Sequence, residues 1–262
     1  MDGLMQNIPG FLLVLCRISA FFLVAPVFTF RGVPNQFKVG IAFFVALLAY
    51  TISSPVVLSF DGYYMLAILR EVLVGALLGF IAYMFFTVVQ IAGSFVDLQM
   101  GFGIVNVMDP VTGAQSPILG SFKYIIAILL FFSLNGHHYL ISAIMDSYQW
   151  IPLEHDAFYQ LYSGAVTSFL SDAFMTAFIL AFQMAAPLIV SLFLADVALG
   201  MLARTAPQFN LFVIGIPIKI LLGFIVFLIM MSGFLALFIH LFQHLLASLE
   251  ELIAILGQSK SS

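Results

Sequence analysis

Two pairs of histidines and one cysteine carry the side chains in this sequence that are best suited to bind a metal ion. His137 and His138 are adjacent, whereas His240 and His244 are four residues apart and share one face of a helix. A zinc site takes three or four protein ligands, and neither pair has a third ligand at a suitable spacing or an HExxH motif. Cys16 is the only cysteine and lies inside an apolar run. We therefore expect packing roles for these residues and predict no metal site.

Other catalytic motifs are also missing from the sequence. It contains no nucleophile elbow, no P-loop and no glycine-rich dinucleotide turn. We predict no catalytic residue, no cofactor and no enzymatic activity, so the energy for any transport must come from elsewhere. The net charge of -4 and the lack of a basic cluster exclude nucleic acid as a partner.

Charged residues within apolar stretches are the more informative polar feature. Arg17 lies nine residues into the apolar run that begins at Ile8, where an unpaired charge costs about 2.5 to 3.5 kcal/mol or more. A functional role is one hypothesis for it, and an ion pair with a carboxylate on a neighbouring helix or subunit is the favoured one. Arg70 and Glu71 are adjacent and point to different faces of one helix, so each is expected to find its partner elsewhere. The residues predicted to lie buried or between subunits are Arg17, Arg70, Glu71, Asp97, Asp196, Arg204, Gln208, Asn210 and Lys219.

The stretch Gln99–Lys123 combines turn-forming residues with a large apolar content. It holds four glycines, two prolines and, between its ends, a single charge, Asp109. Each interior glycine costs a helix about 1 kcal/mol and each proline about 3, so a continuous helix is excluded. Irregular backbone at membrane depth occurs only where protein buries it or where it lines a cavity. We interpret this stretch as a loop inserted into a hollow assembly, where Phe102, Met100 and Met108 would form a hydrophobic constriction.

The elements that must hold this loop are long and apolar. The chain of 262 residues is 63% hydrophobic and 8% charged, against about 25% charged in soluble domains, which indicates a membrane protein. Six apolar runs each reach the length of about 20 residues that a spanning helix needs. They are residues 8–30, 39–60, 72–96, 124–145, 173–195 and 220–249. A short polar turn, residues 204–210, joins the last two runs and predicts an antiparallel hairpin. Gly75 and Gly79 form a GxxxG, which either permits close helix packing or is a chance match.

Several segments together resemble the FliR family. This family comprises the flagellar members of a group of export-gate proteins that is also found in virulence type III secretion systems. The segments are Arg17 with Ala25-Pro26-Val27-Phe28, Met100-Gly101-Phe102 followed by Asp109-Pro110, Arg204-Thr205-Ala206-Pro207-Gln208-Phe209-Asn210, and Gly215-Ile216-Pro217-Ile218-Lys219. The resemblance covers essentially the whole chain.

This resemblance implies an all-α membrane-associated fold of about six long, partly broken helices with a re-entrant glycine-rich loop. It implies a FliP-like N-terminal region (residues 1–172), a FliQ-like hairpin (residues 173–256) and a polar tail (residues 257–262). The loop from Gln99 to about Gly120 would plug the pore from inside. The plug residues so assigned are Met100, Gly101, Phe102, Gly103, Met108, Asp109, Pro110 and Gly113.

The same resemblance implies partners and a location. One copy would assemble with several copies of FliP and FliQ homologues into a closed helical gate, with FlhB and FlhA nearby and unfolded proteins as substrates. The location would be the bacterial inner membrane at the flagellar basal body, with much of the assembled chain above the bilayer plane.

Two alternatives remain open from the sequence. The chain is either the flagellar protein or its virulence-system counterpart, which would carry needle substrates. A secondary transporter for a small solute is the other alternative, because it also uses segments broken by glycine and proline. A transporter would need a matching broken segment in its other half, and the sequence does not show one.

Overall fold

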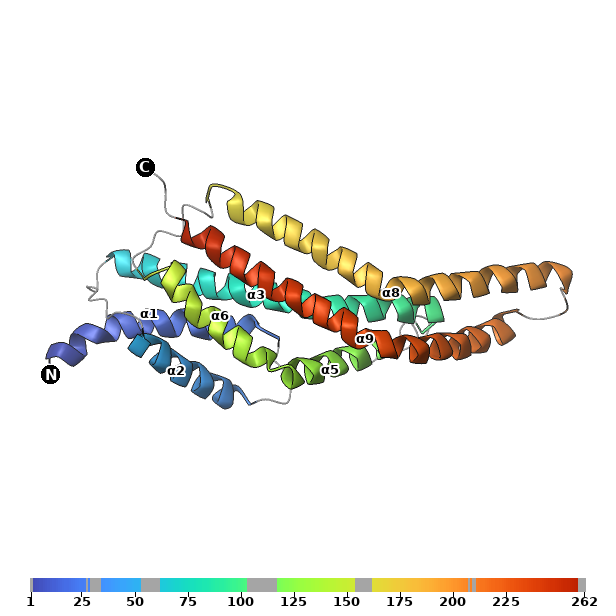
Figure 1. The fold of residues 1–262 in the computed structure, drawn as a ribbon, viewed down its shortest axis with the longest axis horizontal. Helices are drawn as coiled ribbons and strands as arrows, with labels where there is room; N and C mark the ends of the chain where they lie inside the picture. The colour runs from blue at the N-terminus through green and yellow to red at the C-terminus, as the bar shows by residue number, and fades with distance from the viewer. Residues whose placement is uncertain are drawn as a thin grey trace. The chain divides into compact units, whose positions relative to one another are not determined.

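The chain folds into α-helices. The computed structural model describes residues 2–26, 28, 34–52, 62–102, 117–153, 162–206, 208 and 211–258, and these contain no strand. The helices are α1 (Asp2–Val24), α2 (Asn35–Ile52), α3 (Gly62–Met100), α5 (Ile118–Ser133), α6 (Gly136–Trp150), α8 (Ala165–Thr205) and α9 (Leu211–Gly257) (Figure 1). The predicted all-α membrane-associated fold is confirmed.

The six predicted apolar runs correspond to helices of unequal kinds. Within the described residues, the four stretches long and apolar enough to cross a membrane are Asn7–Val24, Gly62–Met100, Ala165–Thr205 and Val213–Gly257. The second run gives only a shorter apolar helix, Gln36–Thr51, and Pro55 follows shortly after it in the sequence. The fourth run is broken into α5 and α6, which meet at a bend of 70° and could together make a fifth span. The expected partly broken helices are therefore present: the fourth run is broken, and the second gives only a shorter helix.

The bend between α5 and α6 has a local cause. Asn135 adopts a left-handed backbone conformation with φ of 56°, which asparagine tolerates better than most residues. A side chain at Gly136 would collide with the ring of Phe131, so the bend needs a glycine there. Pro187, in contrast, lies inside α8 without ending it.

The described chain divides into two compact units, each made from separate parts of the sequence. Unit 1 combines residues 1–84, 131–174 and 243–262, and unit 2 combines residues 85–130 and 175–242. Helices α3, α5, α8 and α9 contribute to both units, so each unit contains one part of each of these helices. The predicted domain boundaries at residues 172 and 256 stay a prediction.

In unit 1, α1 and α3 pack closely through the GxxxG of α3. A Cβ atom built at Gly75 would collide with the carbonyl oxygen of Arg17, and one at Gly79 would lie 2.9 Å from the carbonyl oxygen of Phe21. Both distances are shorter than carbon and oxygen atoms tolerate, so only glycine permits this approach. Of the two interpretations of this motif, close helix packing is the correct one.

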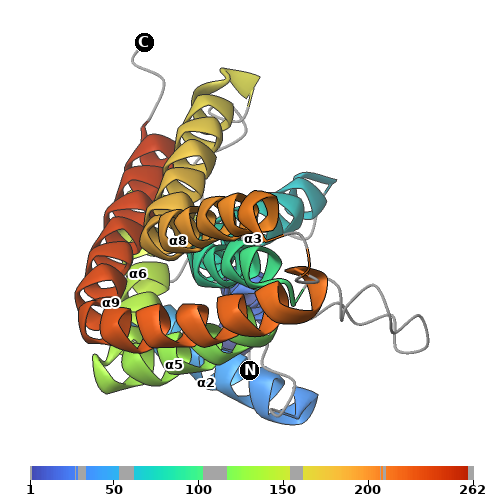
Figure 2. The same ribbon diagram turned by 90° about the vertical axis from the view of Figure 1, so that its right-hand side faces the viewer.

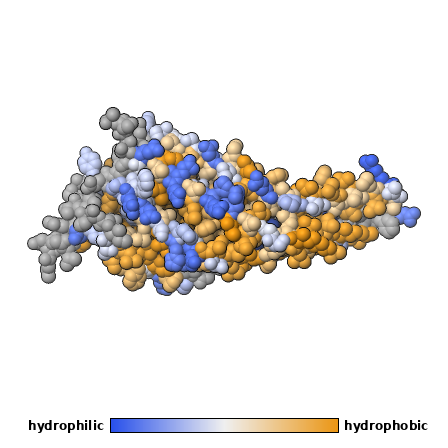
Figure 3. Space-filling view, viewed as in Figure 1, coloured by the Kyte–Doolittle hydropathy of each residue, from blue (hydrophilic) through white to orange (hydrophobic). Residues whose placement is uncertain are grey.

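In unit 2, the end of α8 and the start of α9 form the predicted antiparallel hairpin (Figure 1). The surface of this hairpin is apolar over most of its length and hydrophilic towards the turn (Figure 3). Large apolar side chains such as those of Leu228 and Ile229 are 69% exposed. A surface of this kind is suited to lipid or to other apolar helices and not to water.

The glycine packing of unit 1 can be tested by adding one methyl group. Gly75→Ala should destabilise the protein by about 1 to 3 kcal/mol, because the methyl group overpacks the contact with the backbone of α1. Gly40→Ala in α2 is the matched control, since a Cβ there meets nothing within 4 Å. Thermal midpoints in detergent, measured for both variants, should fall for Gly75→Ala alone; equal midpoints would contradict this packing.

Candidate functional site

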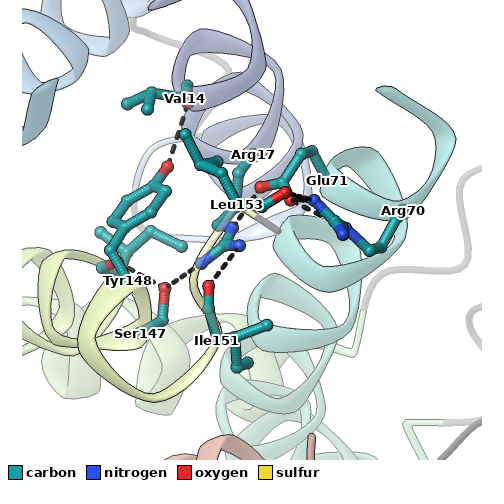
Figure 4. Close-up of polar contacts among 9 residues, drawn as sticks. Val14, Arg17, Arg70, Glu71, Ser147, Tyr148, Ile151 and Leu153 are labelled. Carbon is teal, nitrogen blue, oxygen red and sulfur yellow. Dashed lines mark hydrogen bonds and ion pairs between the residues drawn. The ribbon is translucent and has the colours of Figure 1, made fainter. Parts of the chain in front are cut away.

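A buried cluster of charged and polar groups lies at the centre of unit 1 (Figure 4). Arg17 of α1 is fully buried, and its guanidinium group donates in three directions. Its Nε donates to Glu71 Oε2 of α3 at 2.6 Å, its Nη1 to Ser147 Oγ of α6 at 3.1 Å, and its Nη2 to the carbonyl oxygen of Ile151 at 2.9 Å. The expected ion pair with a carboxylate on a neighbouring helix is therefore present within the chain.

The second arginine of this cluster corrects a prediction. Arg70 Nε and Nη2 donate to Oε1 of the adjacent residue Glu71 at 3.1 and 3.0 Å, and Nη2 also donates to the carbonyl oxygen of Leu153. Each residue has the partner elsewhere that the sequence predicts, Arg17 for Glu71 and the carbonyl oxygen of Leu153 for Arg70, but the implied separation of the two neighbours is wrong, because they also bond to each other. The arginine side chain is long enough to turn back to its neighbour, so that one carboxylate accepts from two guanidinium groups.

The aromatic ring of Tyr148 completes the surroundings of Arg17. The guanidinium carbon lies 4.2 Å from the ring centroid, a cation–π geometry, and Tyr148 Oη donates to the carbonyl oxygen of Val14 at 3.1 Å. The two guanidinium groups share one carboxylate here, and each also donates to a carbonyl oxygen just beyond the C-terminus of α6. Because charges this deeply buried need such partners, the cluster fixes α1, α3 and α6 against one another.

In unit 2, Asp97 joins the two ends of the glycine-rich stretch. Its carboxylate accepts from the backbone N–H of Leu119 at 3.1 Å and of Gly120 at 3.3 Å, in the first turn of α5. A carboxylate at this place satisfies N–H groups that have no partner inside the helix and faces the positive end of its dipole. A Cβ at Gly93 would also collide with Gly120, so α3 and α5 approach closely. The stretch thus leaves and re-enters the helices at one place.

The start of this stretch is anchored by packing. Met100 is fully buried, and its Cε would lie 2.6 Å from a Cβ built at Gly223 of α9. Gly101 follows with φ of 92°, a conformation that favours glycine and ends α3. The ring of Phe102 then lies 6.4 Å from the ring of Phe224 in an edge-on arrangement.

An ion pair connects the hairpin to the same region. Lys219 Nζ of α9 lies 2.9 Å from both carboxylate oxygens of Asp196 of α8, and Gln99 Nε2 of α3 donates to Asp196 Oδ2 at 3.0 Å. The side chains of Lys219 and Asp196 are 18% and 39% exposed, so this pair is partly hydrated. It ties the two arms of the hairpin to the last turn of α3.

The remaining predicted residues have different places. Arg204, in the last turn of α8, and Gln208 are exposed. Six predicted residues lie outside the described residues: Gly103, Met108, Asp109, Pro110, Gly113 and Asn210. Among the residues that the structure does describe, no group of three or more His, Cys, Asp or Glu side chains could hold a metal ion.

Sequence reasoning missed several participants. Ser147 and Tyr148 were not predicted, because hydroxyl groups are common on helices and do not by themselves indicate a buried contact. The roles of the carbonyl oxygens of Ile151 and Leu153 cannot be predicted from the sequence, because every residue has a carbonyl group. Gly223 was also missed, although a glycine inside an apolar helix is a detectable signal for close packing.

Comparison with known proteins gives matches along nearly the whole chain. The family model described as "Bacterial export proteins, family 1" matches residues 8–245. The flagellar biosynthetic protein FliR of Bacillus subtilis (strain 168) is 45% identical over 260 residues, which are 99% of this chain and 100% of that protein. The protein of the same name from Escherichia coli (strain K12) is 31% identical over 241 residues, 92% of this chain and 89% of that protein. Yop proteins translocation protein T of Yersinia pestis is 29% identical over 221 residues, 83% of this chain and 84% of that protein.

The charge cluster of unit 1 can be tested by neutralising its one carboxylate. Glu71→Gln should destabilise the protein by about 3 to 5 kcal/mol, because two buried guanidinium groups lose their counter-charge. Glu250→Gln is the control, since Glu250 is an exposed acid of the same unit. Denaturation in mild detergent should show a large loss for the first variant and an unchanged midpoint for the second; similar midpoints for both would show that the cluster contributes little.

Proposed function

This chain belongs to the bacterial export proteins, family 1, the family of the flagellar FliR proteins, and on that premise we propose that it is a structural and gating subunit of the flagellar type III export gate. The family assignment makes it a membrane component of a type III export apparatus and not an enzyme. The finer proposal is that it forms a protein-conducting pore with FliP and FliQ homologues, and that its glycine-rich loop plugs this pore.

The tethered ends of the glycine-rich stretch are the observation that carries the plug. Because Asp97 bonds to Leu119 and Gly120, a chain that leaves α3 at Met100 must return to the same point at α5. A loop held at both ends by buried contacts can project from one place without loosening its base. The apolar and flexible side chains of Met100, Phe102 and Met108 suit a seal that blocks water and ions yet adapts to a passing chain.

The exposed apolar surface supports the proposed partners. The hairpin of α8 and α9 exposes large apolar side chains along its length (Figure 3). Such a surface needs apolar neighbours, which FliP and FliQ homologues would supply in the gate. FlhB and FlhA are proposed as further partners, and unfolded flagellar proteins as the substrates, driven by the proton gradient and a separate ATPase. The inner membrane at the flagellar basal body is the proposed location.

The charged residues divide between two proposed roles. Arg17, Arg70, Glu71 and Asp97 bond within the chain, which supports a role in holding this subunit's own helices and not in joining subunits. Arg204 and Gln208 lie exposed beside the hairpin turn and are better placed to contact a neighbouring subunit. Asn210 is proposed to join them from the same turn.

The two alternatives now differ in support. The chain is 45% identical to a flagellar protein over its whole length and 29% identical to Yop proteins translocation protein T over a shorter part, which favours the flagellar system. The small-solute transporter has no support from the family, whose description and relatives concern export and protein translocation.

The plug can be tested by shortening the loop while leaving both anchored ends in place. Deletion of Gly103–Gly113 should increase ion conductance through the assembled gate, because the segment that seals the closed pore is gone. Removal of the tail residues 259–262 is the control and should leave conductance unchanged. The measurement is ion leakage in cells and in vesicles that contain equal amounts of assembled complex; an unchanged leak for the loop deletion would contradict the plug.

A further inference from the structure

One face of α9 touches both ends of the glycine-rich stretch. Lys219, Gly223 and Phe227 are spaced four residues apart and therefore follow one another along the same helical face. We call these three residues the α9 stripe. All of its contacts described below lie within unit 2, whose α8–α9 hairpin points its turn towards the viewer in Figure 2.

The first two stripe residues meet the end of α3. Lys219 reaches it through Asp196, whose Oδ2 also accepts from Gln99 at 3.0 Å. Gly223 forms a notch for the fully buried side chain of Met100, because a Cβ at position 223 would lie 2.6 Å from Cε, 2.9 Å from Cγ and 2.9 Å from Sδ. The thioether therefore occupies the volume in which every other residue type would place a side chain.

The third stripe residue meets the start of α5. The ring of Phe227 lies 6.1 Å from the ring of Phe122 and 5.3 Å from the ammonium nitrogen of Lys123. Lys123 is only 4% exposed, so this ring covers a cation that has little access to water. The returning end of the stretch is thus held by the same helical face as the leaving end.

We propose that the α9 stripe holds both ends of the glycine-rich stretch in place when the gate is closed, with Gly223 as the positioning residue. Passage of a substrate chain then requires α3 and α9 to separate at the Met100–Gly223 contact. This inference rests on the proposed export function and adds the element that must move. Asp97 joins the two ends of the stretch, and α9 supports both of them. Displacing one end alone would break the Asp97 bonds, whereas a shift of α9 releases both ends together.

The choice of glycine at position 223 fits this role. Glycine is less favourable than alanine inside a helix, but it allows the methionine side chain to lie this close to the backbone of α9. At Gly233, ten residues further along α9, an added Cβ would meet none of the described residues within 4 Å, so no comparable packing is seen there. This glycine supplies a matched control on the same helix.

A reversible cross-link tests whether α3 and α9 must separate. The variant carries Met100→Cys and Gly223→Cys with Cys16→Ser, which removes the chain's own thiol. Cγ of Met100 marks the place of the new Sγ, and its 2.9 Å to the Cβ of residue 223 matches the separation of about 3 Å across a disulfide. The two thiols are oxidised in the assembled complex, and export of flagellar proteins is then measured before and after reduction.

Export should fall in proportion to the cross-linked fraction, ion leakage should stay low, and reduction should restore export. The two single-cysteine variants, treated with the same oxidant, should be insensitive to it. Two results would overturn the proposal. One is that fully cross-linked complexes export as fast as complexes whose thiols are free, and the other is that the two thiols fail to cross-link. If the loop deletion increases ion leakage but the cross-link leaves export intact, the plug is supported and the movement of α9 is contradicted. If the loop deletion does not increase leakage, the proposed function itself is contradicted.

A size exchange supplies a second readout. Gly223→Ala should increase ion leakage at an equal amount of assembled complex, because its methyl group displaces Met100 from the notch, while Gly233→Ala should not. Combining Gly223→Ala with Met100→Ala removes the three clashing atoms and should bring leakage below that of Gly223→Ala alone. Equal leakage for Gly223→Ala and Gly233→Ala would overturn the positioning role of Gly223.

Discussion

The ion pair between Arg17 and Glu71 imposes the central constraint on this protein. A fully buried guanidinium group in so apolar a chain needs several acceptors, and they come from α3, from α6 and from the residues just beyond α6. Three helices distant in sequence must therefore meet around one side chain. The glycines of α3 allow this meeting, because Gly75 lies against the backbone of Arg17 itself.

The same physical requirement acts in unit 2 with the charges reversed. There Asp97 is buried, and its acceptors are satisfied by the first N–H groups of α5. Polar groups thus lie inside both units, while the hairpin surface is apolar (Figure 3). An exposed apolar surface of this kind is suited to lipids or to apolar partner chains and not to water. A subunit of a membrane gate has such surroundings.

The sequence predicts the helices and the hairpin well, because they follow from long apolar runs and a short polar turn. It also predicts that Arg17 is paired, since a lone charge there would be too costly. It predicts that Arg70 and Glu71 have partners elsewhere but not that they bond to each other, because the rule on adjacent helical residues ignores how far an arginine can turn back. It does not predict the close packing at Gly223 or the use of the carbonyl oxygens of Ile151 and Leu153 as acceptors. These depend on tertiary contacts and backbone geometry that hydrophobic periodicity does not encode.

The most direct test of the account is the mass of the intact particle that contains this chain after purification in mild detergent. The exposed apolar surface of the hairpin predicts that the chain is recovered in a larger complex, one copy together with several copies of its export-gate partners. Recovery of a stable, monodisperse single chain, with residues 101–113 accessible to water-soluble reagents, would contradict the account.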